Sequence, residues 1–224
     1  MLRVVNITTG YGKKQVLTDV SFEVANGDVV LLTGGNGSGK STVLKTIYGL
    51  LKPWTPEGKI IFEGNDITAL PVSAMIQRGI VYMPQKKNVF EDFTVEENLL
   101  TSASIYATAD AKERIKKIYE ALPLLETLRK RTPFHLSGGE RQMLAFGNML
   151  IHSPKLVLLD EPFAGVDVMH TEILKNCIYD LHKNNVTFII VEHKRQLMDD
   201  MVNKVIELEL GTICNKTRME KNNE

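Results

Sequence analysis

Residues 34–41 read GGNGSGKS, and this stretch fits the phosphate-loop pattern G-x-x-x-x-G-K-[ST] at every fixed position. The apolar run VVLL at 29–32 precedes it and predicts a buried strand, and apolar residues at helical spacing begin at Val43. A glycine-rich loop between a strand and a helix can turn consecutive backbone N–H groups toward an anion, because glycine lacks the Cβ that would block the approach. The stretch therefore predicts a site for a nucleoside triphosphate.

Two side chains at the end of this loop are assigned to the phosphates. Lys40 is expected to reach the β- and γ-phosphates, and the Ser41 hydroxyl is expected to coordinate Mg²⁺. The residues expected to contact the nucleotide in this stretch are Gly34, Gly35, Asn36, Gly37, Ser38, Gly39, Lys40, Ser41 and Thr42.

The overall composition is that of an ordinary globular chain. Its 224 residues are 43% hydrophobic and 24% charged, and its 27 basic and 27 acidic residues cancel. A chain without net charge is not drawn to nucleic acid or to anionic lipid by a global field, so no nucleic-acid partner is expected. Cys177 and Cys214 lack metal-ligand spacing, which favours reduced thiols in the cytoplasm. No apolar run approaches the roughly 20 residues that span a bilayer, so a membrane role requires a partner.

The hydrophobic patterns predict an α/β fold in one domain, residues 1–224. Strands are expected at 2–7, 20–24, 29–32, 59–62, 80–83, 156–159, 187–191 and 205–208, followed by a polar, frayed tail from Asn215. No strand pattern occurs between Glu91 and Lys155, where a helical apolar stripe contains Ile115 and Ile118. We therefore expect a phosphate-loop NTPase core with a mostly parallel sheet, an N-terminal antiparallel β-subdomain, and a helical subdomain inserted at approximately 91–153.

Two carboxylates end a buried strand of this core. Asp160 and Glu161 follow the apolar run LVLL, and the carboxyl ends of the strands are where open α/β sheets bind ligands. In phosphate-loop ATPases such an aspartate holds Mg²⁺. Because successive side chains of a strand alternate, Glu161 is expected to face the opposite side and to act as the general base toward a water in line with the γ-phosphate.

A second anion site is predicted far from the first in sequence. Residues 136–140 read LSGGE and precede an apolar helix. Ser137 is a good N-cap, and Gly138 and Gly139 expose backbone N–H groups at the helix start.

Taken in order, these motifs resemble those of the nucleotide-binding subunit of ATP-binding cassette (ABC) transporters, over nearly the whole chain. GGNGSGKS resembles the Walker A motif, LSGGE the signature motif and LVLLDEP the Walker B motif. The resemblance assigns further roles to Tyr11 as the adenine-stacking aromatic, Gln85 as the Q-loop glutamine, His193 as the switch histidine and Asp167 as the D-loop aspartate. It implies that Gln85 and His193 act in catalysis with Glu161, and that Gln85 joins Ser41 and Asp160 at the metal.

The resemblance also implies the partners and the cofactors, ATP and Mg²⁺. Two ATP-binding subunits, identical or different, would pair head to tail, so that each ATP touches Lys40 of one chain and Ser137 and Gly139 of the other. Transmembrane permease subunits would hold the pair at the cytoplasmic face of the membrane. A two-fold dimer is isologous, so both composite sites form together.

The transported substrate is left open between alternatives. The stretches ITALPVSAMIQRGIVYMPQ and NVFEDFTVEENL resemble subunits of branched-chain amino-acid importers, which is the function we favour. LLDEPFAGVD resembles the ATPase of lipopolysaccharide export, the main alternative. A soluble cassette ATPase of iron–sulfur cluster assembly ranks lower, because its relatives usually lack a TVEENL-type segment.

The segment 85–97 is predicted to contact the membrane partner. Val89, Phe90 and Phe93 place apolar groups among charged residues there. One possibility is that they pack under the helical subdomain; the other, implied by the resemblance, is a groove that receives a short helix of a transmembrane subunit.

Overall fold

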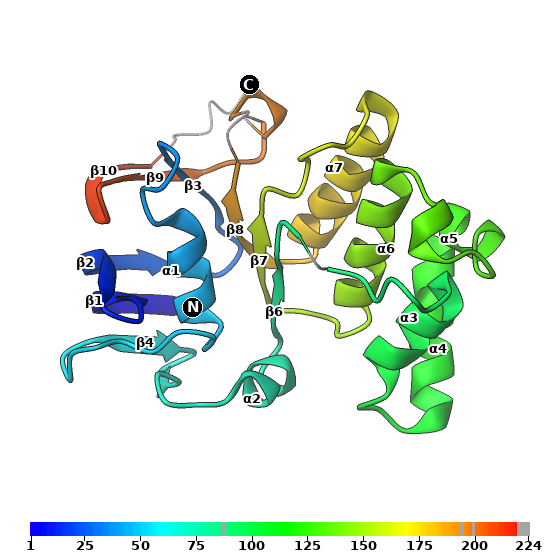
Figure 1. Ribbon diagram of the computed structural model, residues 1–224, viewed down its shortest axis with the longest axis horizontal. Coiled ribbons are helices and arrows are strands. Elements are labelled where there is room, and N and C mark those ends of the chain that lie inside the picture. The colour runs from blue at the N-terminus through cyan, green and yellow to red at the C-terminus, as the bar shows by residue number, and fades with distance from the viewer. Residues whose placement is uncertain (87, 193–194, 199, 219–224) are drawn as a thin grey trace.

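The computed structural model describes residues 1–86, 88–192, 195–198 and 200–218 and contains two sheets flanked by helices (Figure 1). The larger sheet has the strand order β10-β9-β3-β8-β7-β6. Its strands are β3 (Val29–Gly34), β6 (Ile80–Met83), β7 (Leu156–Asp160), β8 (Thr187–Val191), β9 (Lys204–Glu209) and β10 (Thr212–Arg218). Every described pairing in it is parallel except that of β9 with β10. The mostly parallel sheet of the expected core is thus confirmed.

The second sheet is antiparallel and has the order β2-β1-β4-β5. Its strands are β1 (Leu2–Tyr11), β2 (Lys14–Val24), β4 (Lys59–Phe62) and β5 (Asn65–Asp66). Helix α1 (Lys40–Ile47) lies between the two sheets, and its buried Val43, Leu44 and Ile47 join one core cluster with the inward residues of both. This sheet is the antiparallel β-subdomain expected at the N-terminus.

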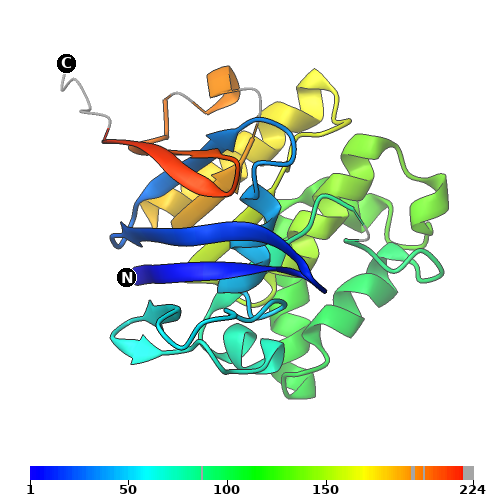
Figure 2. The same cartoon turned by 60° about the vertical axis from the view of Figure 1, so that its left-hand side comes forward.

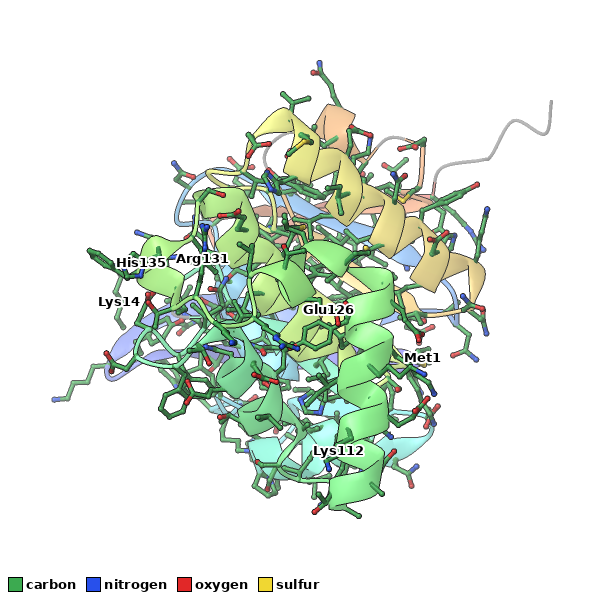
Figure 3. The ribbon with its side chains drawn as sticks, turned by 90° about the vertical axis from the view of Figure 1, so that its right-hand side faces the viewer. Met1, Lys14, Lys112, Glu126, Arg131 and His135 are labelled. Carbon is green, nitrogen blue, oxygen red and sulfur yellow. The ribbon has the colours of Figure 1, made fainter. Side chains whose placement is uncertain are left out.

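Helices fill the region between β6 and β7 and form the helical subdomain (Figure 1). They are α3 (Val95–Ala103), α4 (Thr108–Ala121), α5 (Pro123–Thr127), the 3₁₀ turn η1 (Pro133–His135) and α6 (Gly138–Leu150). Figure 3 looks onto this subdomain, with α4 running along it from near Lys112, and with Arg131 and His135 in the segment that leads into α6. The described residues between 91 and 155 contain no strand, as expected.

The remaining helices are α2 (Val72–Gln77), α7 (Val168–Lys183) and the 3₁₀ turn η2 (Arg195–Leu197). The interior has two clusters, one on each face of the large sheet. One contains β1, β2 and α1, and the other contains α3, α6 and α7. Every residue of β7 and β8 is buried, because helices cover both faces of these strands.

Two expectations about strand ends were wrong. The first strand does not end at residue 7 but continues to Tyr11, because Gly10 lets the hairpin partner approach: a Cβ there would lie 2.0 Å from the Lys14 carbonyl oxygen. The tail is not frayed from Asn215, since β10 extends to Arg218. It is an exposed edge strand whose backbone pairs with β9, and such pairing needs no apolar side chains.

Candidate functional site

The phosphate-type loop connects the carboxyl end of β3 to α1. Gly37 and Gly39 have φ values of 78° and 105°, which L side chains rarely adopt. Gly39 also approaches β2 so closely that a Cβ would lie 2.5 Å from Leu17 Cδ2. Strand β3 is paired on both sides, with β8 and with β9, so the loop starts from a fixed support. The glycines are therefore required by the backbone path of this loop.

Lys40 is the first residue of α1, and its side chain folds back under the loop. Its Nζ donates to the carbonyl oxygens of Gly34 and Gly35, both at 2.9 Å. Burial lowers the pKa of Lys40, while the nearby carboxylates of Glu161 and Asp160 oppose that effect. A partly desolvated ammonium group thus lies against the glycine-rich loop at the start of a helix, an arrangement that suits a polyanion.

Ser41 and Asp160 bring two oxygens together next to Lys40. The Ser41 hydroxyl donates to Asp160 Oδ1 at 2.9 Å, and the Tyr82 hydroxyl donates to Asp160 Oδ2 at 3.2 Å. The pKa of Asp160 is raised by burial, because the two hydrogen bonds, which favour the ionised form, offset that effect only in part. A hydroxyl and a carboxylate at the mouth of the loop are hard oxygen donors, the ligand type that Mg²⁺ prefers. The donor set therefore fits a magnesium ion.

Glu161 lies just beyond the end of β7. Its φ of 52° takes it out of the strand, so its direction is set by this left-handed turn and not by strand alternation, contrary to the sequence argument. Its N–H donates to the Val191 carbonyl at 2.9 Å, which fixes the turn to β8. Gln85 Nε2 donates to Glu161 Oε2. Two residues 76 positions apart are thereby joined at the carboxyl edge of the sheet.

A cavity of about 500 Å³ lies beside Lys40, Ser41 and Glu161. It is lined by Tyr11, Lys14, Gln15, Val16, Asn36, Gly37, Gly39, Lys40, Ser41, Thr42, Glu161 and Leu210. Eight of these twelve were predicted from the sequence. Tyr11 is 45% exposed, and Lys45 Nζ lies 5.6 Å from the centre of its ring. The volume suits a ligand of nucleotide size.

Four lining residues and Tyr82 were missed from the sequence. Lys14, Gln15 and Val16 are the first three residues of β2, which was predicted to start only at Val20. The dipeptide Leu210–Gly211 could have indicated a hairpin turn, since glycine after a strand is a turn signal. Nothing in the sequence distinguishes Tyr82 from an ordinary strand residue.

The helix start at which the second anion site is predicted forms, but it does not line this cavity. Ser137 caps α6: the Glu140 N–H donates to Ser137 Oγ at 3.2 Å, and the Ser137 N–H donates to Glu140 Oε2 at 2.7 Å. A Cβ on Gly138 would lie 2.8 Å from the Gly165 carbonyl oxygen, and one on Gly139 would lie 2.5 Å from His170 Cγ. Gly138 is thus needed for close packing against the loop between β7 and α7, and Gly139 for close packing against the first turn of α7. Within one chain, the structure does not bring them to Lys40.

Asp167 caps α7 beside that helix start. Its Oδ1 accepts from the His170 N–H at 3.0 Å, and its Oδ2 lies 2.5 Å from His170 Nδ1. Both hydrogen bonds lower the pKa of Asp167, and the bond from the His170 backbone N–H has the larger effect. His193, the predicted switch histidine, lies outside the described residues.

In the part of the chain that the structure describes, no helix is both long enough and apolar enough to cross a membrane.

Comparison with known proteins finds similarity to ATP-binding proteins of transport systems. The family model described as "ABC transporter" matches residues 17–164. The high-affinity branched-chain amino acid transport ATP-binding protein BraG of Pseudomonas aeruginosa is 37% identical, with 95% of this chain and 91% of that protein covered. The lipopolysaccharide export system ATP-binding protein LptB of Haemophilus influenzae is 36% identical, with 87% and 81% covered.

Solved structures show the same similarity. A nucleotide-free ATP-binding cassette from an ABC transporter superposes with a TM-score of 0.87 at 32% identity, covering 99% of this chain and 92% of the other. An ADP conformation of such a cassette superposes with a TM-score of 0.84 at 32% identity, covering 99% and 92%.

Proposed function

Since this chain belongs to the ABC transporter family, it is an ATP-binding and ATP-hydrolysing subunit, and we propose that it powers the uptake of branched-chain amino acids or similar solutes. One structural observation carries the enzymatic part. Ser41, which bonds Asp160, lines the same cavity as Lys40 and Glu161, and Gln85 donates a hydrogen bond to Glu161 from outside that lining. The substrate class rests on BraG, whose name states branched-chain amino acid transport. Lipopolysaccharide export is the second candidate, because LptB is similar to almost the same degree.

The roles of the residues follow from their positions. Lys40, released from the Gly34 and Gly35 carbonyls, would bind the β- and γ-phosphates together with the loop N–H groups. Ser41 and Asp160 would hold Mg²⁺, with the Gln85 side-chain carbonyl as a further ligand. Bound Mg²⁺ would neutralise charge on the phosphate oxygens. Glu161 would accept the proton of the attacking water, and His193, which lies outside the described residues, is proposed as a further catalytic residue.

The separation of the two anion sites supports a head-to-tail dimer. At the start of α6, Ser137 and Gly138 are exposed and Gly139 is buried, and none of the three lines the cavity of its own chain. In a two-fold pair, this helix start would contact the ATP held by Lys40 of the partner subunit, and both sites would form at once. Loss of the γ-phosphate would then release the contact between subunits. We propose that residues 1–224 act as one domain in this cycle, with approximately 91–153 as its helical subdomain.

A groove beside Gln85 is the proposed docking site for a transmembrane subunit. It has a volume of about 320 Å³ and is lined by Tyr48, Ile76, Val81, Tyr82, Met83, Pro84, Asn88, Phe90, Ser102, Ala145, Asn148, Met149 and His152. Phe90 is 51% exposed at this groove, with the Phe93 ring centre 5.6 Å away, while Val89 packs on the core. The buried Asn98 holds the segment, since it bonds the Phe90 N–H at 2.8 Å and the carbonyls of Phe90 and Phe93 at 3.0 Å. An exposed aromatic on a fixed backbone suits a short apolar helix, and docking there would place the chain at the cytoplasmic face of the membrane.

Truncation of this anchor gives a first test. Phe90→Ala should weaken assembly with the transmembrane subunit by about tenfold, the effect of removing an aromatic hot spot. The ATPase rate and melting temperature of the isolated chain should change little, because half of the ring is exposed. Co-purification titrated against subunit concentration measures the effect. Tyr179→Ala, which removes an exposed aromatic from α7, is the matched control. A lower melting temperature with unchanged assembly would place Phe90 in the core and the docking site elsewhere.

The function as a whole is tested in vesicles. The chain, combined with its transmembrane subunits and a solute-binding protein, should accumulate leucine, isoleucine or valine only with ATP and Mg²⁺. Phosphate release measured in the same vesicles should rise when the solute is present. ATP-driven extraction of lipopolysaccharide without amino-acid uptake would favour the second candidate. Absence of ATP hydrolysis in the assembled complex would contradict the enzymatic assignment.

A further inference from the structure

The turn between β9 and β10 contains a leucine in an unfavourable conformation. Leu210 and Gly211 are its two central residues, with φ values of 46° and 81°. A two-residue hairpin with positive φ at both positions favours Asn-Gly, because asparagine tolerates the left-handed region far better than leucine. The chain therefore carries leucine where the turn itself would select asparagine.

This leucine is also exposed and lies in the nucleotide cavity. It is 88% exposed, yet it lines the same cavity as Tyr11, Val16 and Lys40. A single exposed leucine on a surface needs no explanation. An exposed leucine with a strained backbone in the wall of a ligand cavity is a different case, because strain that is retained at a site indicates a role there.

The backbone of the turn is attached to the phosphate-type loop. The Gly211 N–H donates to the Ser38 carbonyl at 3.1 Å, and the Gly211 carbonyl accepts from the Thr18 N–H at 2.9 Å. A Cβ on Gly211 would lie 2.0 Å from the Val16 carbonyl oxygen, so the turn touches β2 directly. Figure 2 shows the β9–β10 hairpin lying beside β2. Leu210 is thus held in a fixed position relative to the loop that binds phosphate.

We propose that Leu210 contacts the base of the bound nucleotide and, with Tyr11 and Val16, forms the apolar part of its site. Lys40 and the loop N–H groups would bind the phosphates. A purine presents a large flat apolar surface, and removing that surface from water lowers the free energy of the complex. Tyr11, Val16 and Leu210 are the residues of the lining whose side chains are aromatic or aliphatic. This inference rests on the proposed nucleotide site and adds a residue that determines affinity for the base.

The test separates the base from the phosphates. Leu210→Asn suits the turn and removes the apolar contact, so the melting temperature should be unchanged or higher. The Kd for ATP should rise about three- to tenfold, the loss expected when part of a leucine contact is removed. The Kd for inorganic tripolyphosphate, which has no base, should not change. Calorimetric titration with both ligands measures this. Leu100→Asn, at an exposed leucine of α3 outside the cavity, is the control.

Two further variants keep the test independent of folding. Leu210→Gly also suits positive φ and should raise the Kd for ATP to the same extent as Leu210→Asn. Leu210→Met keeps the apolar bulk and should bind ATP with the Kd of the wild-type chain. An unchanged Kd for ATP in both Leu210→Asn and Leu210→Gly would overturn the inference. Equal weakening of ATP and tripolyphosphate would also overturn it, since the turn would then act through the Ser38 contact. A wild-type chain that bound neither ligand would instead overturn the proposed function.

Discussion

Replacement of Glu161 by Gln should lower ATP turnover by roughly 10²- to 10⁴-fold, the range for loss of a general base, while ATP binding is retained. The amide keeps the size of the side chain but cannot accept the proton of the attacking water. The loop, Lys40 and the Ser41–Asp160 pair are untouched, so the closed ATP-bound dimer should form and persist. Phosphate release and size-exclusion chromatography with ATP and Mg²⁺ measure the two effects together.

The control for this variant is Glu120→Gln, which changes an exposed carboxylate on α4 that pairs only with Lys116 in the described residues. Its turnover should equal that of the wild-type chain. If Glu161→Gln hydrolysed ATP at the normal rate, the general base would lie elsewhere, and His193 would be the next residue to replace.

Lys40→Ala should weaken ATP binding by at least about 100-fold. An ammonium group that bonds two phosphates makes charge-assisted hydrogen bonds, each worth about 1.5–3 kcal/mol, and alanine makes none. The fold should be retained, because within the described residues Lys40 Nζ donates hydrogen bonds only to the Gly34 and Gly35 carbonyls of its own loop. Fluorescent-nucleotide titration and thermal unfolding, run on the same preparation, separate the two properties.

Lys116→Ala, at an exposed lysine of α4, is the matched control and should bind ATP normally. An ATP affinity of Lys40→Ala close to that of the wild-type chain would show that the loop does not hold the phosphates through this side chain. A large loss of melting temperature would show that Lys40 supports the fold as well as the site.

Much of the site could be predicted because its chemistry is local in sequence. The loop at 34–41 needs glycine at fixed positions and a lysine at the helix start, and the structure has positive φ at Gly37 and Gly39. The capping pairs are local too: Ser137 with Glu140, and Thr94 with Glu97, both form with the spacing of three that a capping box requires. Patterns of this kind are readable because the interacting groups are neighbours.

The parts that could not be predicted depend on contacts between distant segments. Tyr82 bonds Asp160 across 78 positions, and Leu210 enters the cavity because its turn bonds Ser38. Strand β10 forms by backbone pairing along a polar sequence, for which hydrophobic period gives no signal. Glu161 was assigned to a strand, but a left-handed φ decides its direction. In each case the cause is a contact between segments that are distant in sequence, and the pattern of a single sequence carries no signal for such a contact.

Gln85 contacts Glu161 at the proposed ATP site and also lies close in sequence to the proposed membrane-docking site. This position limits the distance between the two sites. Gln85 is five residues before Phe90 in the sequence. Even a fully extended chain of five residues spans no more than about 18 Å. The proposed metal ligand Gln85 and the proposed membrane anchor Phe90 are therefore joined by a short covalent segment. If both roles hold, a shift of Gln85 by a few ångströms would displace Phe90 or bend this segment, without a relay through the helical core.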